Sequence, residues 1–310
     1  MNEIKIFTPA TIANVSCGFD ILGLCLDSVG DEMVIRKSKE KGVKITKIEG
    51  QDLPREADKN VAGVAVLALL DALKSDAGFE IEIYKKIKPG SGIGSSAASS
   101  AGAVFAVNEL LGKPFSTQEL VRFAMQGEKL ASGTAHADNV APALFGGFTM
   151  VTSYDPLNVI KIDAPEELYA TVIHPQIEVK TADSRSVLKQ NVSLKTLVSQ
   201  MGNFGGLISG LYTQDYELIG RSLHDEIVEP NRSILIPAFD QVKESCLRNG
   251  ALGSGISGSG PSIFALSRGE GTAKKVAQGM SDIYEKIQVD FDIHISKVNP
   301  SGMKVLEVRS

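Results

Sequence analysis

A loop rich in glycine and serine has the composition of a site for a phosphate group. It reads Gly90-Ser91-Gly92-Ile93-Gly94-Ser95-Ser96 and separates a predicted strand from a predicted helix. Backbone N–H groups at the start of a helix lack partners within it, and the helix dipole adds positive potential there. Glycines let the backbone approach a ligand closely, and serines add hydroxyl donors. A plain turn before a core helix is the alternative, but the glycine spacing and the serine pair favour an anion site.

Two other phosphate motifs do not account for this sequence. A P-loop needs the pattern G-x-x-x-x-G-K-[ST], whereas Gly112-Lys113 is followed by Pro114. The letters of a dinucleotide-binding fingerprint occur at 253–258, where they follow a predicted helix and precede a predicted strand. That fingerprint belongs between a strand and a helix, so we interpret this match as false.

The elements that must position the loop alternate between strands and helices along the whole chain. Ser116 and Glu119 have the spacing of a capping box, which marks the start of a helix. Segment 9–20 is small, polar and rich in turn formers, which predicts a connecting segment. The alternation indicates an α/β or α+β protein with two layers. From apolar periodicity we predict strands at 5–7, 33–36, 43–48, 79–84, 148–152, 169–174, 261–266 and 290–297, and helices at 60–73, 97–111, 116–131, near 137–139, 184–188, 194–211, 216–223, 237–249 and 272–287.

Length and composition favour a globular protein of two domains and exclude several classes. The chain has 310 residues, of which 43% are hydrophobic, and its net charge of −5 argues against nucleic-acid binding. The longest apolar stretch, 61–70, is about half of the ~20 residues that a membrane span needs. The start of the chain has no signal-peptide pattern. The three cysteines are scattered without metal-site spacing, which fits a reducing cytoplasm.

Three segments, in the right order, resemble the motifs of the GHMP kinases. Pro9-Ala10-Thr11-Ile12-Ala13-Asn14 with Gly18-Phe19-Asp20 is similar to the first motif, the loop at 90–96 to the second, and 253–262 to the third. The first and third motifs take the form typical of the homoserine kinases of that family. The resemblance covers nearly the whole chain. One departure is that the family usually has a proline two residues before the first glycine of the loop, where this chain has Lys88 followed by Pro89.

The resemblance implies an α+β, two-domain GHMP kinase fold. Residues 1–155 would form an N-terminal domain similar to ribosomal protein S5, with a left-handed β-α-β unit, and residues 156–310 a ferredoxin-like C-terminal domain. It also implies a homodimer. ATP would lie with its phosphates on the loop, and the acceptor would occupy the cleft between the domains. The implied ATP-binding residues are Pro89, Gly90, Ser91, Gly92, Ile93, Gly94, Ser95, Ser96 and Ala97.

The resemblance further implies a Mg²⁺ site. Phosphoryl transfer relies on positioning and charge stabilisation, and Mg²⁺ prefers oxygen ligands. Glu128 matches the metal carboxylate of the family, and Ser96 matches its hydroxyl partner. Without the resemblance, Glu128 reads as part of a solvated helix face.

For the acceptor, the resemblance implies an amino acid. Arg185 and Arg232 stand where homoserine kinases hold the substrate carboxylate, and the guanidinium fork suits a carboxylate. Asp20 matches the partner of the ammonium or hydroxyl group. Taken alone, each arginine reads as half of a surface ion pair. Further implied substrate contacts are Asn14, His136, Thr181 and Gly258.

The role of Asp138 and Asn139 in catalysis stays open at this level. Mevalonate kinases carry an aspartate in the corresponding stretch, where it acts as a base, so Asp138 is a candidate base. Homoserine kinases are argued to work without one, by aligning the hydroxyl with the γ-phosphate. The implied reaction converts ATP and L-homoserine to ADP and O-phosphohomoserine, on the way to threonine. Alternatives are a mevalonate or shikimate kinase, a nucleic-acid-binding module and a catalytically inactive sensor.

Overall fold

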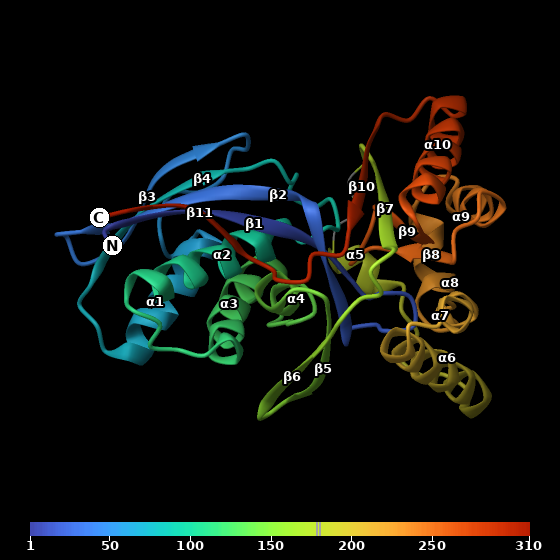
Figure 1. The fold of residues 1–310 in the computed structure, drawn as a ribbon, viewed down its shortest axis with the longest axis horizontal. Coiled ribbons are helices and arrows are strands. Elements are labelled where there is room, and N and C mark those ends of the chain that lie inside the picture. Colours follow the sequence, from blue (N-terminus) through green and yellow to red (C-terminus); the bar gives the residue numbers. More distant parts are fainter. Residues whose placement is uncertain (178, 180) are drawn as a thin grey trace.

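The computed structural model describes residues 1–177, 179 and 181–310, except the side chains of 181 and 182. Two β-sheets organise the chain, and helices pack against each of them (Figure 1). Among the described residues, none of the helices combines the length and the apolar character that a membrane crossing requires. The mixture of segregated helices and largely antiparallel strands confirms the predicted α+β class.

The larger sheet has the strand order β11-β1-β2-β4-β3, with β5 paired to β2 and β6 paired to β5. Helices α1 to α4 cover one face of this sheet (Figure 1). The strands are β1 (Glu3–Ala13), β2 (Leu22–Ser38), β3 (Gly42–Glu49), β4 (Gly78–Tyr84), β5 (Phe148–Tyr154), β6 (Leu157–Ile162) and β11 (Lys304–Arg309), and the helices are α1 (Val61–Leu73), α2 (Ser95–Leu110), α3 (Thr117–Ser132) and α4 (Val140–Phe145).

Local sequence signals account for the elements around the loop. In β4, Phe79, Ile81 and Ile83 are buried while the residues between them are not, as the alternation predicts. Helix α2 is made almost entirely of Ala, Ser, Gly and Val, and most of its residues are buried. Small side chains let α2 lie in the centre of the helical layer, against β1, α1 and α3. The capping box of Ser116 and Glu119 is confirmed at the start of α3.

The smaller sheet has the order β10-β7-β9-β8, and all its pairings are antiparallel. Its chain order, strand, helices, two strands, helix and strand, is that of a ferredoxin-like domain. The elements are β7 (Leu168–Pro175), α5 (Thr181–Ser186), α6 (Leu194–Thr213), α7 (Tyr216–Ser222), α8 (Glu229–Arg232), a 3₁₀ turn (Ser233–Leu235), α9 (Phe239–Arg248), β8 (Gly253–Ile256), β9 (Ile263–Arg268), α10 (Glu270–Lys286) and β10 (Phe291–Lys297).

The structure differs from the predicted elements where a strand forms by pairing with another strand that is distant in the sequence. The prediction that 9–20 is a connecting segment is wrong for 9–13, because β1 continues to Ala13 in pairing with β2. Strand β8 was not expected, but it is followed by another strand, so the fingerprint at 253–258 is confirmed as a false match. Strands β6 and β11 were not expected either.

Strands β6 and β11 both belong to the larger sheet, although they lie beyond residue 155. The second predicted segment, 156–310, therefore contributes two strands to the sheet that the first segment builds. The division at 155 stays a prediction. The parallel pair β3 and β4 is joined through α1, and the predicted left-handedness of this crossover also stays a prediction.

Candidate active site

A cavity of about 540 Å³ collects most of the residues that the motifs single out. Its walls come from the turn after β1, the loop before α2, helix α3, the segment before α4, helices α5 and α8, and the turn between β8 and β9. Segments from both sheets therefore build one site. The lining residues are Asn14, Asp20, Pro89, Gly90, Gly92, Gly94, Ser95, Ser96, Glu128, Ala131, Ser132, His136, Asp138, Asn139, Val179, Arg185, Arg232, Gly258 and Ser259.

The glycine loop runs straight into the N-terminus of α2. Gly90, Gly92 and Gly94 all have positive φ angles, which glycine adopts without strain. Helix α2 starts at Ser95 rather than at 97 as predicted, and its N-cap, Gly94, offers no side-chain cap. The first N–H groups of this long helix therefore remain available beside the cavity. Ser95 donates to the Ile87 carbonyl at 2.9 Å, which leaves Ser96 as the hydroxyl toward a ligand.

The three motifs contact one another behind the loop. The Ser257 hydroxyl donates to the Gly92 carbonyl at 2.7 Å, and the Gly258 amide donates to the Ala13 carbonyl at 3.0 Å. A Cβ at Gly92 would meet the carbonyl oxygens of Ser257 and Gly260 at 2.7 and 2.8 Å. Because backbone atoms cannot move aside easily, this position excludes any side chain. The loop is thus held against the β8–β9 turn by close backbone packing.

A buried ion pair lies beneath the start of α2. The Lys85 ammonium pairs with Asp31 and also donates to the Ser95 carbonyl at 2.9 Å and the Ser99 hydroxyl at 3.1 Å. The other oxygen of Asp31 accepts from the backbone N–H groups of Lys86 and Ile87, at 2.6 and 2.8 Å. Burial lowers the pKa of Lys85, and Asp31 opposes that change. This pair, which sequence reasoning missed, fixes both the entry to the loop and the first turn of the helix.

Glu128 points a carboxylate toward the same helix start. Its side chain is buried, and among the described residues its Oε1 atom has no hydrogen-bond partner. Burial raises the pKa of Glu128 to about 7, and nearby Asp138 adds to this, while Ser96, Ser100 and Lys85 act in the opposite direction. A cation would relieve such an unpartnered carboxylate oxygen. The pair of Glu128 and Ser96 therefore fits an oxygen-coordinated ion such as Mg²⁺.

Asp20, Arg185 and His136 form a charged cluster on the cavity wall. Arg185 Nη2 lies 3.1 Å from Asp20 Oδ1 and 2.7 Å from His136 Nε2. Because a guanidinium can only donate, His136 Nε2 must be the unprotonated nitrogen, and the Nδ1 proton faces Asp20 at 3.7 Å. Burial and the Arg185 charge lower the pKa of His136, against the effect of Asp20. The histidine is thus neutral and orients the arginine.

Arg232 is a second, more deeply buried guanidinium on this wall. It donates to the Ser184 carbonyl at 2.9 Å and the Gly258 carbonyl at 3.2 Å, and among the described residues it has no ion-pair partner. Burial lowers the pKa of Arg232 to about 10, which still leaves it charged at neutral pH. Two arginines around one cavity, one of them without a fixed counter-charge, suit a ligand with a carboxylate.

Phe19 supports both arginines, and sequence reasoning missed this role. Its ring centroid lies 4.9 Å from the Arg232 guanidinium carbon and 5.8 Å from that of Arg185. The only signal available in the sequence was the place of Phe19 in the first motif. The nearby Asn14 is also fixed, because its amide donates to the Gly258 carbonyl at 2.8 Å and its oxygen accepts from the Asp20 N–H at 2.8 Å.

Asp138 and Asn139 both line the cavity, in different surroundings. Asp138 is buried, and burial together with the Asp20 charge raises its pKa to about 7. Asn139 accepts a hydrogen bond from Thr11 at 2.7 Å, directly under Gly94. Asn139 is thus tied to the loop, whereas the Asp138 carboxyl is able to exchange a proton near neutral pH.

Three predicted site residues whose side chains the structure describes do not line the cavity. Ser91 and Ile93 turn their side chains into the interior, and Ala97 is buried within α2, so these three would act only through their backbone. The side chain of Thr181, at the start of α5, lies outside the described residues. The roles of all the site residues stay predictions.

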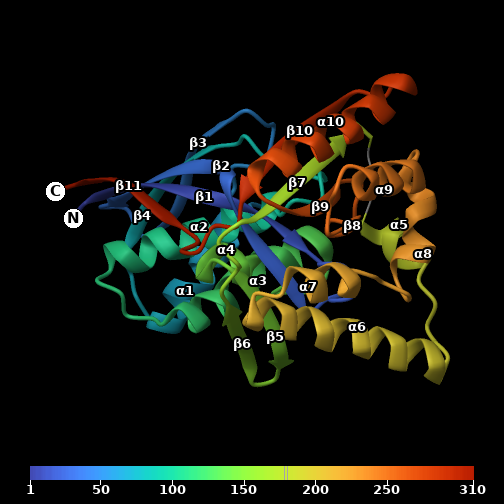
Figure 2. The same ribbon diagram turned by 45° about the vertical axis from the view of Figure 1, so that its right-hand side comes forward.

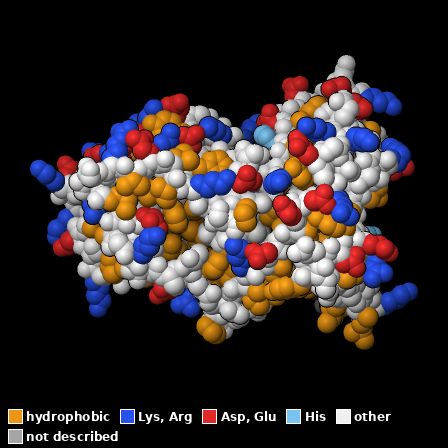
Figure 3. All heavy atoms as spheres, viewed as in Figure 1, with side chains coloured by type: hydrophobic (Ala, Val, Ile, Leu, Met, Phe, Trp, Pro, Cys, Tyr) orange, Lys and Arg blue, Asp and Glu red, His pale blue; other side chains and the backbone are white. Residues whose placement is uncertain are grey.

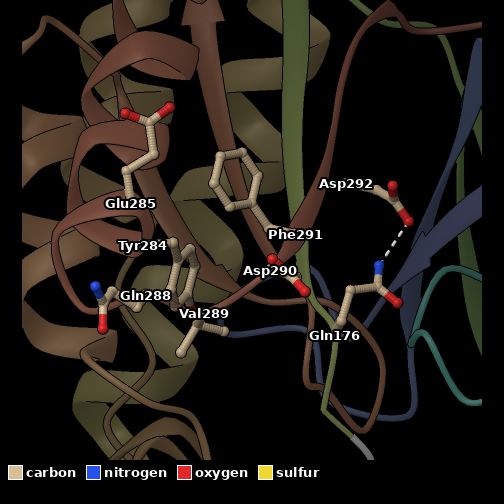
Figure 4. A pocket seen from close by; sticks show the side chains of 8 residues that line it. All are labelled: Gln176, Tyr284, Glu285, Gln288, Val289, Asp290, Phe291 and Asp292. Carbon is tan, nitrogen blue, oxygen red and sulfur yellow. Dashed lines mark hydrogen bonds between the residues drawn. The ribbon is translucent and has the colours of Figure 1, made fainter.

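A second hollow, of about 590 Å³, lies where the end of α10 meets the start of β10 and the end of β7 (Figure 4). Its lining combines the aromatic rings of Tyr284 and Phe291 with carboxylates such as Asp290 and Asp292. Gln176 joins this hollow to the segment before the glycine loop, because it accepts from Lys88 and donates to Asp292, both at 2.6 Å. Its lining has three carboxylates and neither Lys nor Arg, whereas the cavity at the glycine loop also has two arginines and a helix N-terminus, so the latter is the better candidate for a phosphate despite its slightly smaller volume.

Comparison with known families agrees with this arrangement. A model described as the GHMP kinases N terminal domain matches residues 60–147, and one described as GHMP kinases C terminal matches residues 207–286. The first match contains the glycine loop, Glu128 and Asp138.

Individual relatives match over much more of the chain. A homoserine kinase of Chlorobium phaeobacteroides strain BS1 is 48% identical, over 99% of this chain and all of the relative. The crystal structure of a homoserine kinase from Cytophaga hutchinsonii ATCC 33406 is 52% identical, with a TM-score of 0.95 over 99% of this chain and 98% of that one. A mevalonate kinase of L. major has a TM-score of 0.71 over 95% of this chain and 96% of that one, at 18% identity, and so shares the fold.

Proposed function

Because this chain belongs to the GHMP kinases and both close relatives described above are homoserine kinases, we propose that it transfers the γ-phosphoryl group of ATP to the side-chain hydroxyl of L-homoserine. One observation carries the proposal most directly. The glycine loop at the start of α2 and the cluster of Asp20, Arg185 and Arg232 line the same cavity. A phosphate donor and a zwitterionic acceptor can therefore meet there.

For the nucleotide, the available N–H groups of α2 and the Ser96 hydroxyl supply donors to the phosphates. The positive φ angles of the loop favour glycine, which has no side chain to stand between the backbone and a ligand. Ser96 and Glu128 would hold Mg²⁺, which when bound would neutralise charge on the phosphates. The unpartnered Oε1 of Glu128 supports this assignment.

For the acceptor, opposite charges are already arranged in the cavity. The homoserine carboxylate would bind Arg232 and Arg185, and the ammonium group would bind Asp20. Arg185 and Asp20 are paired with each other in the structure, so a zwitterion would find both charges within reach of one another. With both charged groups bound at this wall, the hydroxyl of the short side chain is directed away from it, toward the phosphates.

Asp138 is the group we assign as acceptor of the hydroxyl proton. Its pKa of about 7 lies near the pH at which an enzyme of this kind works, which is the condition for efficient general-base catalysis. Burial protects the carboxyl from bulk water. Asn139 would hold the loop in place through Thr11.

An assay of ADP release across four acceptors tests the function. We expect activity with L-homoserine and none above background with mevalonate, shikimate or galactose. Activity confined to mevalonate or shikimate would assign the chain to another branch of the family and overturn the proposal.

A variant separates the acceptor subsite from the nucleotide subsite. We expect Arg185→Ala to raise the KM for homoserine strongly while the KM for ATP stays near its original value, because Arg185 contacts Asp20 and His136 and belongs to the cluster assigned to the acceptor. An equal loss for both substrates would mean that the variant disturbs folding rather than one subsite.

The wider setting follows from this activity. O-phosphohomoserine is the product that leads to threonine, so we place the protein in threonine biosynthesis, in the cytoplasm. We also propose a homodimer, and residues 1–155 and 156–310 as the two domains, with β6 and β11 crossing between them.

A further inference from the structure

Helix α6 presents apolar side chains to solvent along its whole length. Leu194, Val198, Met201 and Tyr212 are 76%, 62%, 63% and 62% exposed. The space-filling view shows apolar side chains gathered over this helix at the lower right of the molecule (Figure 3). Figures 1 and 2 both place α6 at the outer surface. Isolated exposed apolar residues are ordinary, but a continuous row of them indicates a surface that is covered by a partner.

These four exposed residues, together with exposed Gly205 and partly buried Ile208, follow the spacing of a coiled-coil seam. Counted along the chain, the steps between them are four, three, four, three and four residues, which is the a/d pattern of a heptad repeat. The buried residues of α6, Gln200, Leu207, Gly210 and Leu211, lie on the other side of the helix. In this row Ile208 is partly buried and packs against the core, whereas the other five members are exposed. We call the row the outer seam, and it consists of Leu194, Val198, Met201, Gly205, Ile208 and Tyr212.

The outer seam is complementary to a reversed copy of itself. If two α6 helices pack antiparallel about a two-fold axis at their midpoint, Leu194 faces the partner's Tyr212 and Val198 faces the partner's Ile208. The central pair then places Met201 against the partner's Gly205. Gly205 is exposed and a Cβ there would meet nothing within 4 Å, so there is room for the long methionine side chain. A two-fold interface requires this kind of self-complementarity.

Charge favours the same antiparallel arrangement. The only charged residue of α6 is Lys195, in its first turn. The opposite end is the negative end of the helix dipole and is followed by Asp215 and Glu217. Antiparallel packing brings Lys195 next to the partner's negative end, whereas parallel packing would bring two lysines together.

We propose that a second copy of this chain binds to the outer seam of α6, forming an antiparallel helix pair across the two-fold axis of a homodimer. The inference names the surface of the homodimer proposed above. It does not depend on which acceptor the enzyme phosphorylates.

Sedimentation velocity tests the interface. The wild-type protein is expected to be a dimer, and Val198→Glu with Met201→Glu should weaken dimerisation by about 100-fold or more, because it places four charges in an apolar contact. Leu247→Glu, on α9 and 51% exposed, is the matched control and should leave the dimer intact. ADP release by each variant reports folding separately. A monomeric wild type, or a dimer that survives the double substitution, overturns the proposal.

Cross-linking tests the antiparallel register. The native cysteines, Cys17, Cys25 and Cys246, are all buried, so a new cysteine on α6 will be the site that reacts. With a short bismaleimide, Met201→Cys should cross-link to its own copy near the axis. Leu194→Cys should not, because antiparallel packing separates the two copies of residue 194 by about 27 Å at 1.5 Å per residue. Cross-linking at 194 as efficient as at 201 would contradict the proposal.

Discussion

The guanidinium carbon of Arg232 lies 4.9 Å from the ring centroid of Phe19. Phe19 belongs to the turn after β1, and Arg232 ends α8, so this contact joins the two parts of the chain across the cavity. An aromatic face is one of the few surfaces that can stabilise a buried guanidinium without neutralising it. Arg232 is thereby held in place and still able to bind a carboxylate.

Removing the ring should weaken homoserine binding selectively. Phe19→Leu keeps an apolar side chain but loses a cation–π contact of about 0.5–2 kcal/mol, which corresponds to roughly a 2- to 30-fold rise in the KM for homoserine. The KM for ATP should change little. Phe19→Tyr keeps the ring and is the control. Initial-rate kinetics with each substrate varied in turn measure the two KM values. An equal rise of the KM for homoserine and the KM for ATP in the leucine variant would contradict the prediction.

Gly92 should tolerate no side chain, for a reason that goes beyond its φ angle. Gly92→Ala forces a Cβ against two backbone carbonyls, whereas Gly112→Ala has a similar positive φ and open space around the new Cβ. Gly112→Ala should cost about 1–2 kcal/mol of unfolding free energy from backbone strain alone. Gly92→Ala should cost more and should also raise the KM for ATP. Urea unfolding and kinetics measure both effects, and equal behaviour of the two variants would refute the packing argument.

Breaking the buried ion pair should destabilise the protein strongly. Lys85→Met leaves Asp31 buried without its counter-charge, which typically costs about 3–5 kcal/mol. Adding Asp31→Asn should recover part of this loss. Lys41→Met removes one half of an exposed pair with Asp76 and should change stability little. Urea denaturation gives the values; a Lys85→Met variant as stable as the Lys41→Met variant would show that the buried pair is unimportant.

The raised pKa of Asp138 should make stability depend on pH. Its folded-state pKa is about 7, above the unfolded value of about 3.9. Between these values the folded state binds more protons than the unfolded state, so the unfolding free energy falls as pH rises from about 4 to 7. The unfolding free energy of Asp138→Asn, taken relative to that of the wild type, should therefore be higher at pH 8 than at pH 5. Asp163→Asn, at a highly exposed position, serves as the control and should show no such difference.

The same substitution tests the catalytic role of Asp138. If it accepts the hydroxyl proton, Asp138→Asn should lower kcat by about 100-fold or more and abolish the rise of kcat around pH 7. The KM for homoserine should change less, because Arg185 and Arg232 remain. A variant with nearly unchanged kcat would favour transfer by alignment of the hydroxyl alone.

Elements that are fixed by interactions between residues close in the sequence could be predicted, whereas elements that are fixed by pairing of distant segments could not. The capping box at Ser116 and the alternation in β4 are local, so the sequence is enough to predict them. The continuation of β1 to Ala13 depends on pairing with β2, and β11 depends on a partner at the other end of the chain. Such pairings leave little trace in local periodicity.

The residues of the candidate site also divide into those that the sequence predicts and those that only the structure reveals. The glycine loop could be singled out from its residue types and spacing. Asp20, Arg185 and Arg232 could be singled out only through their match to the family, because each arginine alone reads as half of a surface ion pair. Lys85 and Asp31 could not, because a lysine at the end of a strand gives no sign of being buried. Phe19 resembles any core aromatic until the structure shows two guanidinium groups near its ring.

The pairing of β11 with β1 also affects how the protein can be made. Glu3 pairs with Arg309, so the strand that covers one edge of β1 is synthesised about 300 residues later. At about 5–20 residues per second, that edge waits roughly 15–60 s for its partner. An uncovered edge strand is a template for pairing with other chains. Nascent chains on one messenger RNA are therefore most exposed to aggregation through β1, and a chaperone that shields this edge would increase the yield of folded protein.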